Sequence, residues 1–460
     1  MNEWIVLLEI ILPVLFGVPL ITVRFRDKEK EKMMVYVTLL FALLIVLNIF
    51  ACYGEQVTLL DHPLFEISPS VRAALWVLLL FGFLFIYEII VCDGSYLRVA
   101  SALTLLSGSL ILIYTSIPFT NSLLVKKSLV HSILPIIGLE TMTISSIGLY
   151  FSEKRIGIEA LVKYILTVLV SSSFIVIGIL LFFTEYNTDF LMPIATAFLV
   201  TGISMEIGLV PFHMWLPDVS MGVPPSSIAY SVFVGDSSLI IFLAIFSVSL
   251  YNIVHTSFIA IMVILALFSM SIGEISALSQ RVLRRMLGYS IISDAGYIIV
   301  GVIAESMLQM KDPWMVTFFV LTSNIAISSI YIILGSLEKD GIPLTLDNLK
   351  GLYMAQPIAA ILLSIFFLSM AGIPPFAGFY AKLYILSYLM ETFEYWLGYV
   401  AAFFFLVCVA YSLLVIFRLA SQGEAPELKN KDVLLPLFFS AIFLILLGLW
   451  PDLFYVLGGI

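Results

Sequence analysis

Apolar residues along the chain gather into long blocks that are separated by short polar or charged stretches. Most blocks contain about 20 residues, the length that a helix needs to cross the hydrocarbon core of a bilayer. The pattern lacks the ten-residue strands of alternating hydrophobicity that are typical of membrane β-barrels. We therefore predict an all-α polytopic membrane protein with about fourteen transmembrane helices, over residues 4–23, 33–53, 73–92, 97–117, 129–151, 159–183, 192–210, 226–250, 252–275, 283–303, 313–337, 356–390, 396–420 and 433–458.

Proline interrupts two of these segments. The segment 192–210 ends at Pro211, and the segment 356–390 is too long for one straight span and contains Pro374 and Pro375. Proline breaks helices, which membrane proteins tolerate where protein or a water-filled cavity satisfies the freed carbonyl groups. The sequence thus predicts two broken helices.

Paired broken helices indicate an inverted repeat with ion sites at the breaks. We expect a single transmembrane domain that begins with N-terminal helices over 1–117. A first half-repeat over 118–250 and a second over 251–420 follow, and a C-terminal helix over 421–460 completes the chain.

Composition and charge agree with a multi-pass protein of the cell membrane. Of the 460 residues, 62% are hydrophobic and 12% are charged, whereas soluble domains carry about 25% charged residues. With the N-terminus outside, most of the 22 lysines and arginines fall at inner loops and the adjoining span ends. This asymmetry follows the positive-inside rule and favours an even number of spans with both termini outside.

The chain carries no recognisable cofactor or metal motif. Cys52, Cys92 and Cys408 are far apart and form no Cys-x-x-Cys pair, which argues against an iron–sulfur or zinc site. No phosphate-binding glycine motif is present. The net charge of -9, with basic residues confined to loops, argues against a nucleic-acid partner. We expect no cofactor and no catalytic residue, so redox chemistry must take place on a partner.

Five ionisable residues lie inside the predicted spans: Glu140, Glu206, Asp236, Asp294 and Lys382. Each costs about 2.5–3.5 kcal/mol to insert near the bilayer centre. One buried carboxylate can simply hydrogen-bond a neighbouring helix, and this structural reading is as good as a functional one for an isolated acid. Five such groups on separate spans favour at least one role in ion transport.

Glu140 lies among hydroxyl-bearing residues in the middle of its span. Thr141, Thr143, Ser145 and Ser146 follow it closely. These side chains could hydrogen-bond the carboxylate or hold water beside it.

His213 follows Glu206 by two turns, about 10 Å along a continuous helix. It could relay protons or simply cap the broken helix, and the sequence favours neither. Lys382 follows the second break, where a desolvated lysine can change its protonation; the alternative is a permanent pair with a carboxylate. We expect Glu9 and Glu88, near span ends, to reach the membrane interface.

Several ordered motifs resemble the antiporter-like subunits of complex I, multisubunit sodium/proton antiporters and membrane-bound hydrogenases. They lie at 209–218 (LVPFHMWLPD), 369–379 (SMAGIPPFAGF, with Lys382 after it), 344–352 (LTLDNLKGL), 284–297 (RRMLGYSIISDAGY) and 159–164 (EALVKY). Several motifs in the family's order are far more specific than any one of them.

The resemblance implies a row of protonatable residues along the membrane midplane, coupled to a redox reaction elsewhere in a complex. Glu140 matches the family's buried glutamate, and Lys382 matches its lysine after the second break. Glu206 and Asp236 stand where the family commonly has lysines, and Asp294 stands where a histidine is common. These departures remove the glutamate–lysine pair at Glu140, so acids instead compete for a proton.

The leading hypothesis is a non-catalytic subunit of a membrane oxidoreductase that moves protons or sodium. Its partners would be other membrane subunits, peripheral redox subunits and the lipid bilayer. Two alternatives are a subunit of a cation/proton antiporter without a redox arm, and a structural subunit that no longer translocates ions. A free-standing solute transporter is weaker, because nothing in the sequence indicates a substrate pocket.

Overall fold

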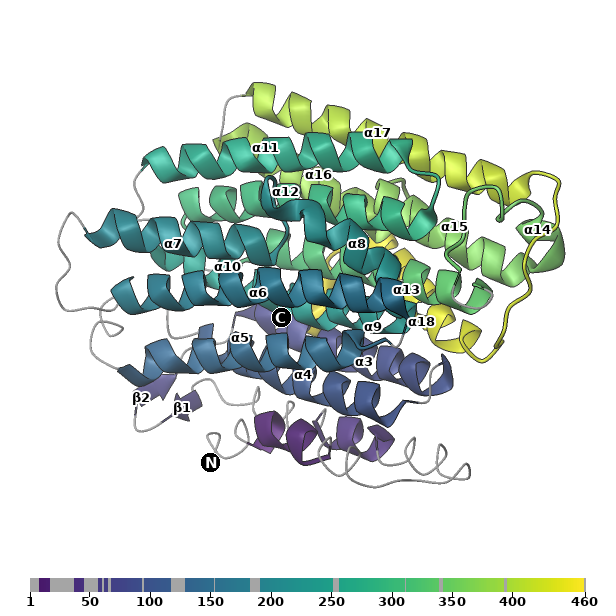
Figure 1. Ribbon diagram of the computed structural model, residues 1–460. Helices are drawn as coiled ribbons and strands as arrows, with labels where there is room; N and C mark the ends of the chain where they lie inside the picture. The colour runs from purple at the N-terminus through teal and green to yellow at the C-terminus, as the bar shows by residue number, and fades with distance from the viewer. Residues whose placement is uncertain are drawn as a thin grey trace.

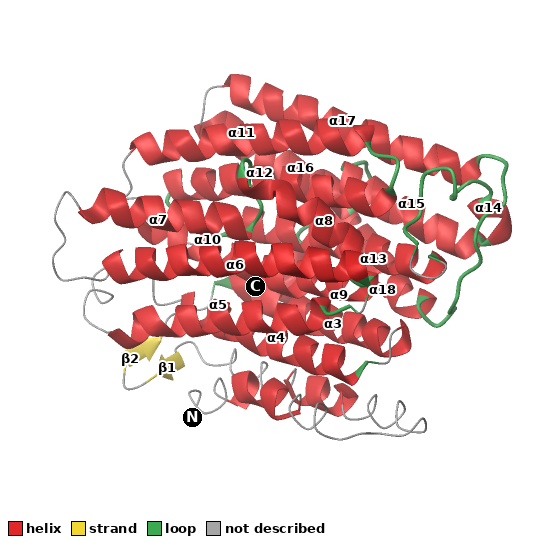
Figure 2. Ribbon diagram, viewed as in Figure 1, coloured by secondary structure: helices red, strands yellow, loops and turns green. Residues whose placement is uncertain are grey.

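The computed structural model describes residues 8–16, 37–44, 57–59, 62–64, 68–92, 95–116, 129–152, 154–182, 191–250, 256–310, 312–338, 342–392 and 395–458. Helices dominate these residues, and residues 8–16 and 37–44 are also helical (Figure 2). Two short strands, β1 (Val57–Leu59) and β2 (His62–Leu64), form an antiparallel hairpin at one edge. The predicted all-helical fold is confirmed, and the predicted spans 4–23 and 33–53 lie largely outside the described residues.

The helices lie side by side as one bundle (Figure 1). In chain order they are α3 (Pro69–Cys92), α4 (Tyr96–Ser116), α5 (Leu129–Tyr150), α6 (Arg155–Phe182), α7 (Leu191–Glu206), η4 (Phe212–Met214), α8 (Trp215–Gly222), α9 (Pro225–Tyr230), η5 (Ser231–Asp236), α10 (Ser237–Leu250), α11 (Thr256–Ser279), α12 (Leu283–Met307), α13 (Trp314–Leu337), α14 (Leu352–Ala355), α15 (Pro357–Ala371), α16 (Ala377–Thr392), α17 (Tyr395–Ala420), α18 (Leu434–Leu449) and α19 (Leu453–Leu457).

Eight helical segments of the described chain are long and apolar enough to cross a membrane. They are α3, α4, α6, the run from α9 to α10, α11, α12, α13 and α17, and α7, α15 and α18 are shorter apolar helices. The number fourteen stays a prediction. In the span of α13, 94% of the residues are buried, against 28% in the span of α11. Helix α13 therefore lies inside the bundle, and α11 presents apolar side chains to the surroundings.

The two predicted breaks are present and share their local geometry. In the first, Gly208 adopts φ +73° and the Val210–Pro211 peptide bond is cis. In the second, Gly372 adopts φ +73° and the Pro374–Pro375 bond is cis. A positive φ favours glycine because it has no Cβ, so the same Gly-x-x-Pro spacing ends α7 and α15.

Two predicted spans are less regular than expected. Residues 226–250 contain η5, a π-helical turn that ends at Asp236, and such turns are common at functional sites. The predicted segment 433–458 is not one continuous helix, because α18 ends at Leu449 and α19 begins at Leu453. Pro451 explains this interruption, since proline cannot donate the helical hydrogen bond and its ring clashes with the preceding turn.

Candidate functional site

The first break brings two of the predicted acids to one buried cavity. Glu206 ends α7 and Asp236 ends η5, and both line a cavity of about 50 Å³. The Ser171 hydroxyl, on α6, donates to Glu206 Oε2 at 2.5 Å. The cavity has room for a few water molecules, and Tyr150 and Tyr164 also line it. We call this space the acid cavity.

None of the described residues that line the acid cavity is basic. Asp236 interacts electrostatically with Glu206, which also interacts with Glu140 on α5. Two like charges in a buried site strongly disfavour each other's ionised form. The three predicted acids of the first half are thus electrostatically connected through Glu206.

The hydroxyl groups around Glu140 do not bond its carboxylate, so this part of the prediction is wrong. Thr141 donates to the Ile137 carbonyl, Thr143 to the Glu140 carbonyl, and Ser145 to the Thr141 carbonyl. Serine and threonine inside helices commonly bond the carbonyl one turn back. These hydroxyls are therefore occupied by the backbone of α5.

Ser146 also donates to its own helix, through the Met142 carbonyl, and lies 3.4 Å from the Ser231 hydroxyl. Both serines line the acid cavity. Its polar wall therefore comes from both α5 and η5.

His213 does not line the acid cavity. The helix that would have carried it ends at Glu206, the chain turns at Gly208, and His213 lies in the short helix η4. The expected 10 Å separation along a continuous helix therefore does not apply. The His213 side chain is buried, and its Nδ1 has no hydrogen-bond partner among the described residues.

The second break positions Lys382 in the interior of the bundle. Lys382 lies on α16 with 7% of its surface exposed, and its Nζ lies 4.5 Å from the centre of the Phe405 ring. Nζ has no hydrogen-bond partner among the described residues. A cation over an aromatic face is stabilised by about 2 kcal/mol when desolvated. The expectation of a lysine beside the break is confirmed, and no fixed salt bridge in the described residues ties it to a carboxylate.

Two buried carboxylates interact electrostatically with Lys382. Asp294, on α12, accepts a hydrogen bond from Ser323 at 2.5 Å. Glu274, on α11, accepts one from Ser293 at 2.9 Å through Oε1, and its Oε2 is buried without a partner among the described residues. The second cluster thus contains one lysine and two acids, in contrast to the acid cavity.

Sequence reasoning missed Glu274 and Glu305. Glu274 lies at the end of the predicted span 252–275, where hydropathy suggests an interface, yet it is 1% exposed. Glu305 lies just beyond the predicted span 283–303 and accepts hydrogen bonds from the backbone of Met315 and Val316 at 2.8 and 3.1 Å. Both carboxylates are therefore buried although they lie at or beyond the ends of predicted spans.

Glu9 and Glu88 are also fully buried, contrary to prediction. The Tyr114 hydroxyl donates to Glu9 at 2.5 Å. A helix end predicted from hydropathy marks where apolar residues stop, and it does not show which neighbours cover the last turn.

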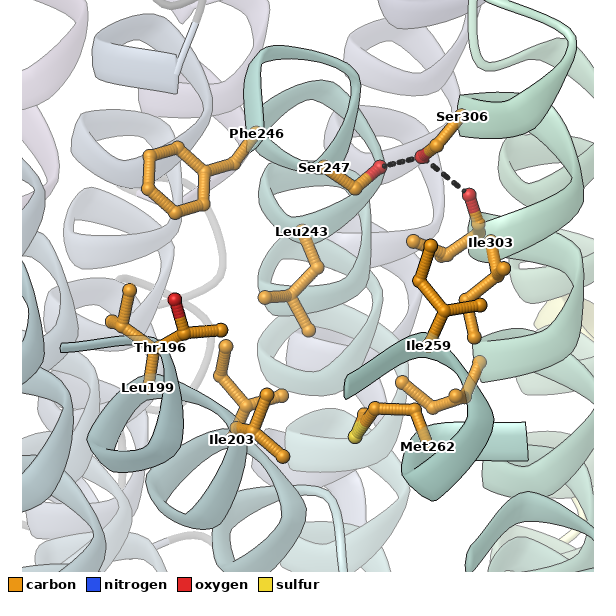
Figure 3. A pocket seen from close by; sticks show the side chains of 13 residues that line it. Thr196, Leu199, Ile203, Leu243, Phe246, Ser247, Ile259, Met262, Ile303 and Ser306 are labelled. Atoms are coloured by element: carbon orange, nitrogen blue, oxygen red, sulfur yellow. Dashed lines mark hydrogen bonds between the residues drawn. The ribbon is translucent and has the colours of Figure 1, made fainter. Parts of the chain in front are cut away.

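A further pocket of about 120 Å³ lies between α7, α10, α11 and α12 (Figure 3). Its lining is apolar apart from a few hydroxyls, such as Ser306, which donates to Ser247 at 2.7 Å. It contains no ionisable side chain among the described residues, so it does not belong to the charged clusters. The described residues also hold no group of three His, Cys, Asp or Glu side chains suited to a metal ion.

Comparisons with known proteins identify the family of the chain. Residues 128–410 match the family described as NADH:quinone oxidoreductase/Mrp antiporter, TM. NADH-quinone oxidoreductase subunit N from Herminiimonas arsenicoxydans is 30% identical over 348 residues, which are 68% of this chain and 69% of that protein.

Two solved structures show the same fold. A chain of the Mrp complex from Dietzia sp. DQ12-45-1b aligns with a TM-score of 0.82 at 19% identity and covers 100% of this chain and 96% of its own length. A chain of respiratory complex I from Thermus thermophilus with bound aureothin aligns with a TM-score of 0.79 at 19% identity, covering 97% and 98%.

Proposed function

The chain belongs to the NADH:quinone oxidoreductase/Mrp antiporter transmembrane family, and we propose that it is an antiporter-like membrane subunit of a complex I-related oxidoreductase. In this role it moves protons or sodium ions across the membrane while partner subunits transfer electrons. We expect it to act together with other membrane subunits and with peripheral redox subunits that carry the redox groups.

The observation that carries the proposal is the buried lysine at the second break. Lys382 Nζ has no hydrogen-bond partner among the described residues and faces the electrostatic influence of Asp294 and Glu274. A charged group in such a place costs several kcal/mol unless a fixed partner offsets the cost, so an unpaired buried lysine favours a functional role. Lys382 can release its proton to one of the two acids and take it back, and the surrounding charge decides which state is favoured.

The acid cavity has a different resting state. Burying two carboxylates without a nearby cation favours a state in which at least one of them keeps its proton. We therefore assign Glu206 and Asp236 the role of binding a proton inside the acid cavity. Glu140 acts on Glu206 electrostatically. We assign His213 a secondary role, because it lies outside the acid cavity.

The central experiment compares Lys382→Ala with Glu206→Gln in the intact complex. Ion uptake is measured in vesicles and normalised to electron transfer. We expect Lys382→Ala to reduce uptake more strongly, because it removes the only cation of the second cluster among the described residues. Lys431→Ala, at an exposed lysine outside both clusters, is the matched control.

The possible results separate the candidate functions. A larger loss from Glu206→Gln would show that the acidic first half is the main path. No loss of ion uptake in either variant, with normal assembly, would favour a structural subunit. This is the second candidate function, because none of the described residues that line the acid cavity is basic. Co-purification without any redox subunit would instead favour an antiporter without a redox arm.

A further inference from the structure

A large cavity opens at the end of the bundle where basic residues gather. Its volume is about 580 Å³, and its lining includes Arg98, Lys154, Arg284 and Lys429, with Glu338 as the acid among the described lining residues. The positive-inside rule assigns such an end to the cytoplasmic side. We call this space the inner vestibule.

Arg284 is a nearly buried part of the lining of the inner vestibule. Its guanidinium pairs with Glu338 at 3.4 Å and also donates to the Val223 carbonyl. The residue is 3% exposed. These contacts fix Arg284 between α13 and the link from α8 to α9, so its backbone is also held in place.

Two buried hydroxyls lie next to Arg284. Ser220, on α8, donates to the Arg284 carbonyl, and its Oγ lies 2.5 Å from the Tyr331 hydroxyl on α13. Both residues are fully buried. Because the single proton of Ser220 is used on the carbonyl, Tyr331 must be the donor to Ser220.

On its other side, the helix of Tyr331 packs against the wall of the acid cavity, because Asn324, also on α13, donates to the carbonyl of Val232, which lines that cavity. Its hydroxyl interacts electrostatically with Asp236 as well as with Arg284. Tyr150, which lines the acid cavity, interacts with both Tyr331 and Asp236. Tyr331 thus lies between a residue of the inner vestibule and a residue of the acid cavity.

Helix α8, which carries Ser220, packs closely against α12. A Cβ at Gly288 would lie 2.9 Å from Pro217 Cα and 3.1 Å from Ser220 Cβ. Glycine at this position lets α8 approach α12 closely. The neighbouring residues of α8 contribute to both spaces, since Val219 lines the acid cavity and Met221 lines the inner vestibule.

We propose that the Tyr331 hydroxyl is the link through which protons pass between the inner vestibule and the acid cavity, with Ser220 as its partner on the vestibule side. The inference rests on the proposed function and adds a route to the carboxylates of the first half. In the arrangement seen, Ser220 is bonded to a carbonyl, which does not accept a proton outright, so the link is closed. For transfer from the vestibule, it opens when the Ser220 hydroxyl turns from the Arg284 carbonyl toward the Tyr331 oxygen and the Tyr331 hydroxyl turns toward the acid cavity, so that water in the vestibule can donate to Ser220.

The transfer leaves both hydroxyls neutral. For movement from the inner vestibule to the acid cavity, water in the vestibule gives a proton to Ser220, and Ser220 passes its own proton to Tyr331. Tyr331 then passes its proton, through water in the acid cavity, to an ionised Asp236. Each oxygen loses one O–H bond and gains another, so no other reactant is needed. After the transfer, each hydroxyl donates in the opposite direction, and rotation of the two hydroxyl groups restores the starting arrangement.

The test compares Tyr331→Phe with Tyr230→Phe in the intact complex. The first change removes the linking hydroxyl with almost no change in volume. Tyr230 is also fully buried, but its hydroxyl has no partner among the described residues. We expect Tyr331→Phe to reduce the rate of proton uptake, normalised to electron transfer, by about a hundredfold. This is the lower end of what a positioned proton-transfer group contributes. Tyr230→Phe should have no effect.

Lys382→Ala, measured in parallel, separates failure of this inference from failure of the proposed function. Slow uptake in Lys382→Ala together with normal uptake in Tyr331→Phe would overturn the link alone. Normal uptake in both would overturn the proposed function and the link with it.

Accessibility provides a readout that does not depend on transport. A membrane-impermeant thiol reagent applied from the inner side is expected to label Ser226→Cys, in the inner vestibule, and to spare Ser231→Cys, in the acid cavity. Equal labelling of the two would show an open water path and contradict the proposed separation of the two spaces. In Tyr331→Ala, which removes the side chain between the two spaces, Ser231→Cys is expected to become reactive.

Discussion

Glu338→Leu should destabilise the protein strongly, because it leaves Arg284 buried without its counter-ion. The two side chains are 4% and 2% exposed. At their 3.4 Å separation, an effective dielectric constant of about 20 gives an attraction of about 5 kcal/mol. Breaking a buried pair by removing one partner costs about 3–5 kcal/mol, so we expect a loss of this size.

Replacing both partners should be far less harmful. Burial raises the pKa of Glu338, and Arg284 and Lys429 only partly offset this effect. The cost of desolvation is therefore not fully recovered by the pairing. In Arg284→Met/Glu338→Leu we expect most of the stability to return, with a remaining deficit of about 1–3 kcal/mol because the Val223 carbonyl loses its donor.

Equilibrium unfolding of the purified chain in mixed micelles measures these differences. The control is Asp347→Asn, which breaks an exposed pair with Lys350 at 2.7 Å, where Asp347 is 66% exposed. Despite the shorter distance, we expect a loss of about 1 kcal/mol or less, because solvent screens the exposed pair. Equal stability of Glu338→Leu and the unaltered chain, or a double variant as unstable as the single one, would refute the reasoning.

Two further predictions concern the second break and the start of α13. Gly378→Ala should disturb the second break, because its Cβ would lie 1.7 Å from the Ser369 carbonyl oxygen. We expect a loss of more than about 3 kcal/mol in the same unfolding assay. The control Gly82→Ala, whose nearest contact would be 3.7 Å, should be neutral. Glu305→Leu should cost about 1–3 kcal/mol, because two backbone N–H groups lose their acceptor, and Glu305→Gln, which keeps an acceptor oxygen, should recover most of this; equal losses in the two variants would contradict the capping role.

The breaks could be predicted from the sequence because they depend on local chemistry. Pro211 and Pro374 each remove a helical hydrogen bond and closely follow a glycine with positive φ, whereas Pro135, with no such glycine before it, lies inside α5. The exact helix end was less predictable: α7 stops at Glu206, several residues before Pro211, because Gly208 turns the chain first. The same glycine takes His213 off the expected helical path.

The partners of the buried acids could not be predicted, because they come from distant segments. Ser171 reaches Glu206 from another helix, 35 residues away in sequence. The threonines and serines beside Glu140 are near it in sequence, yet their hydroxyls bond the backbone of α5. Proximity in sequence therefore identified polar residues without showing which groups they serve.

Glu274 shows a second limit. Its place at the end of an apolar block gave no sign of burial, and Lys382, whose charge acts on it, comes from a far later helix. A hydropathy profile measures only the residue and its neighbours along the chain. Burial of an end-of-span acid depends on helix packing, which here places α11 directly against α12.

The two clusters differ in charge, and this difference constrains how the halves can work together. In the second cluster, a protonated Lys382 and one ionised acid form a neutral arrangement, so a proton can shift between them without leaving an isolated buried charge. In the acid cavity, release of a proton leaves a carboxylate with no cation among the described lining residues. Release there is therefore favourable only when another proton arrives or a positive charge approaches. A route past Tyr331 meets the first condition, because a proton supplied from the inner vestibule can replace each proton that leaves.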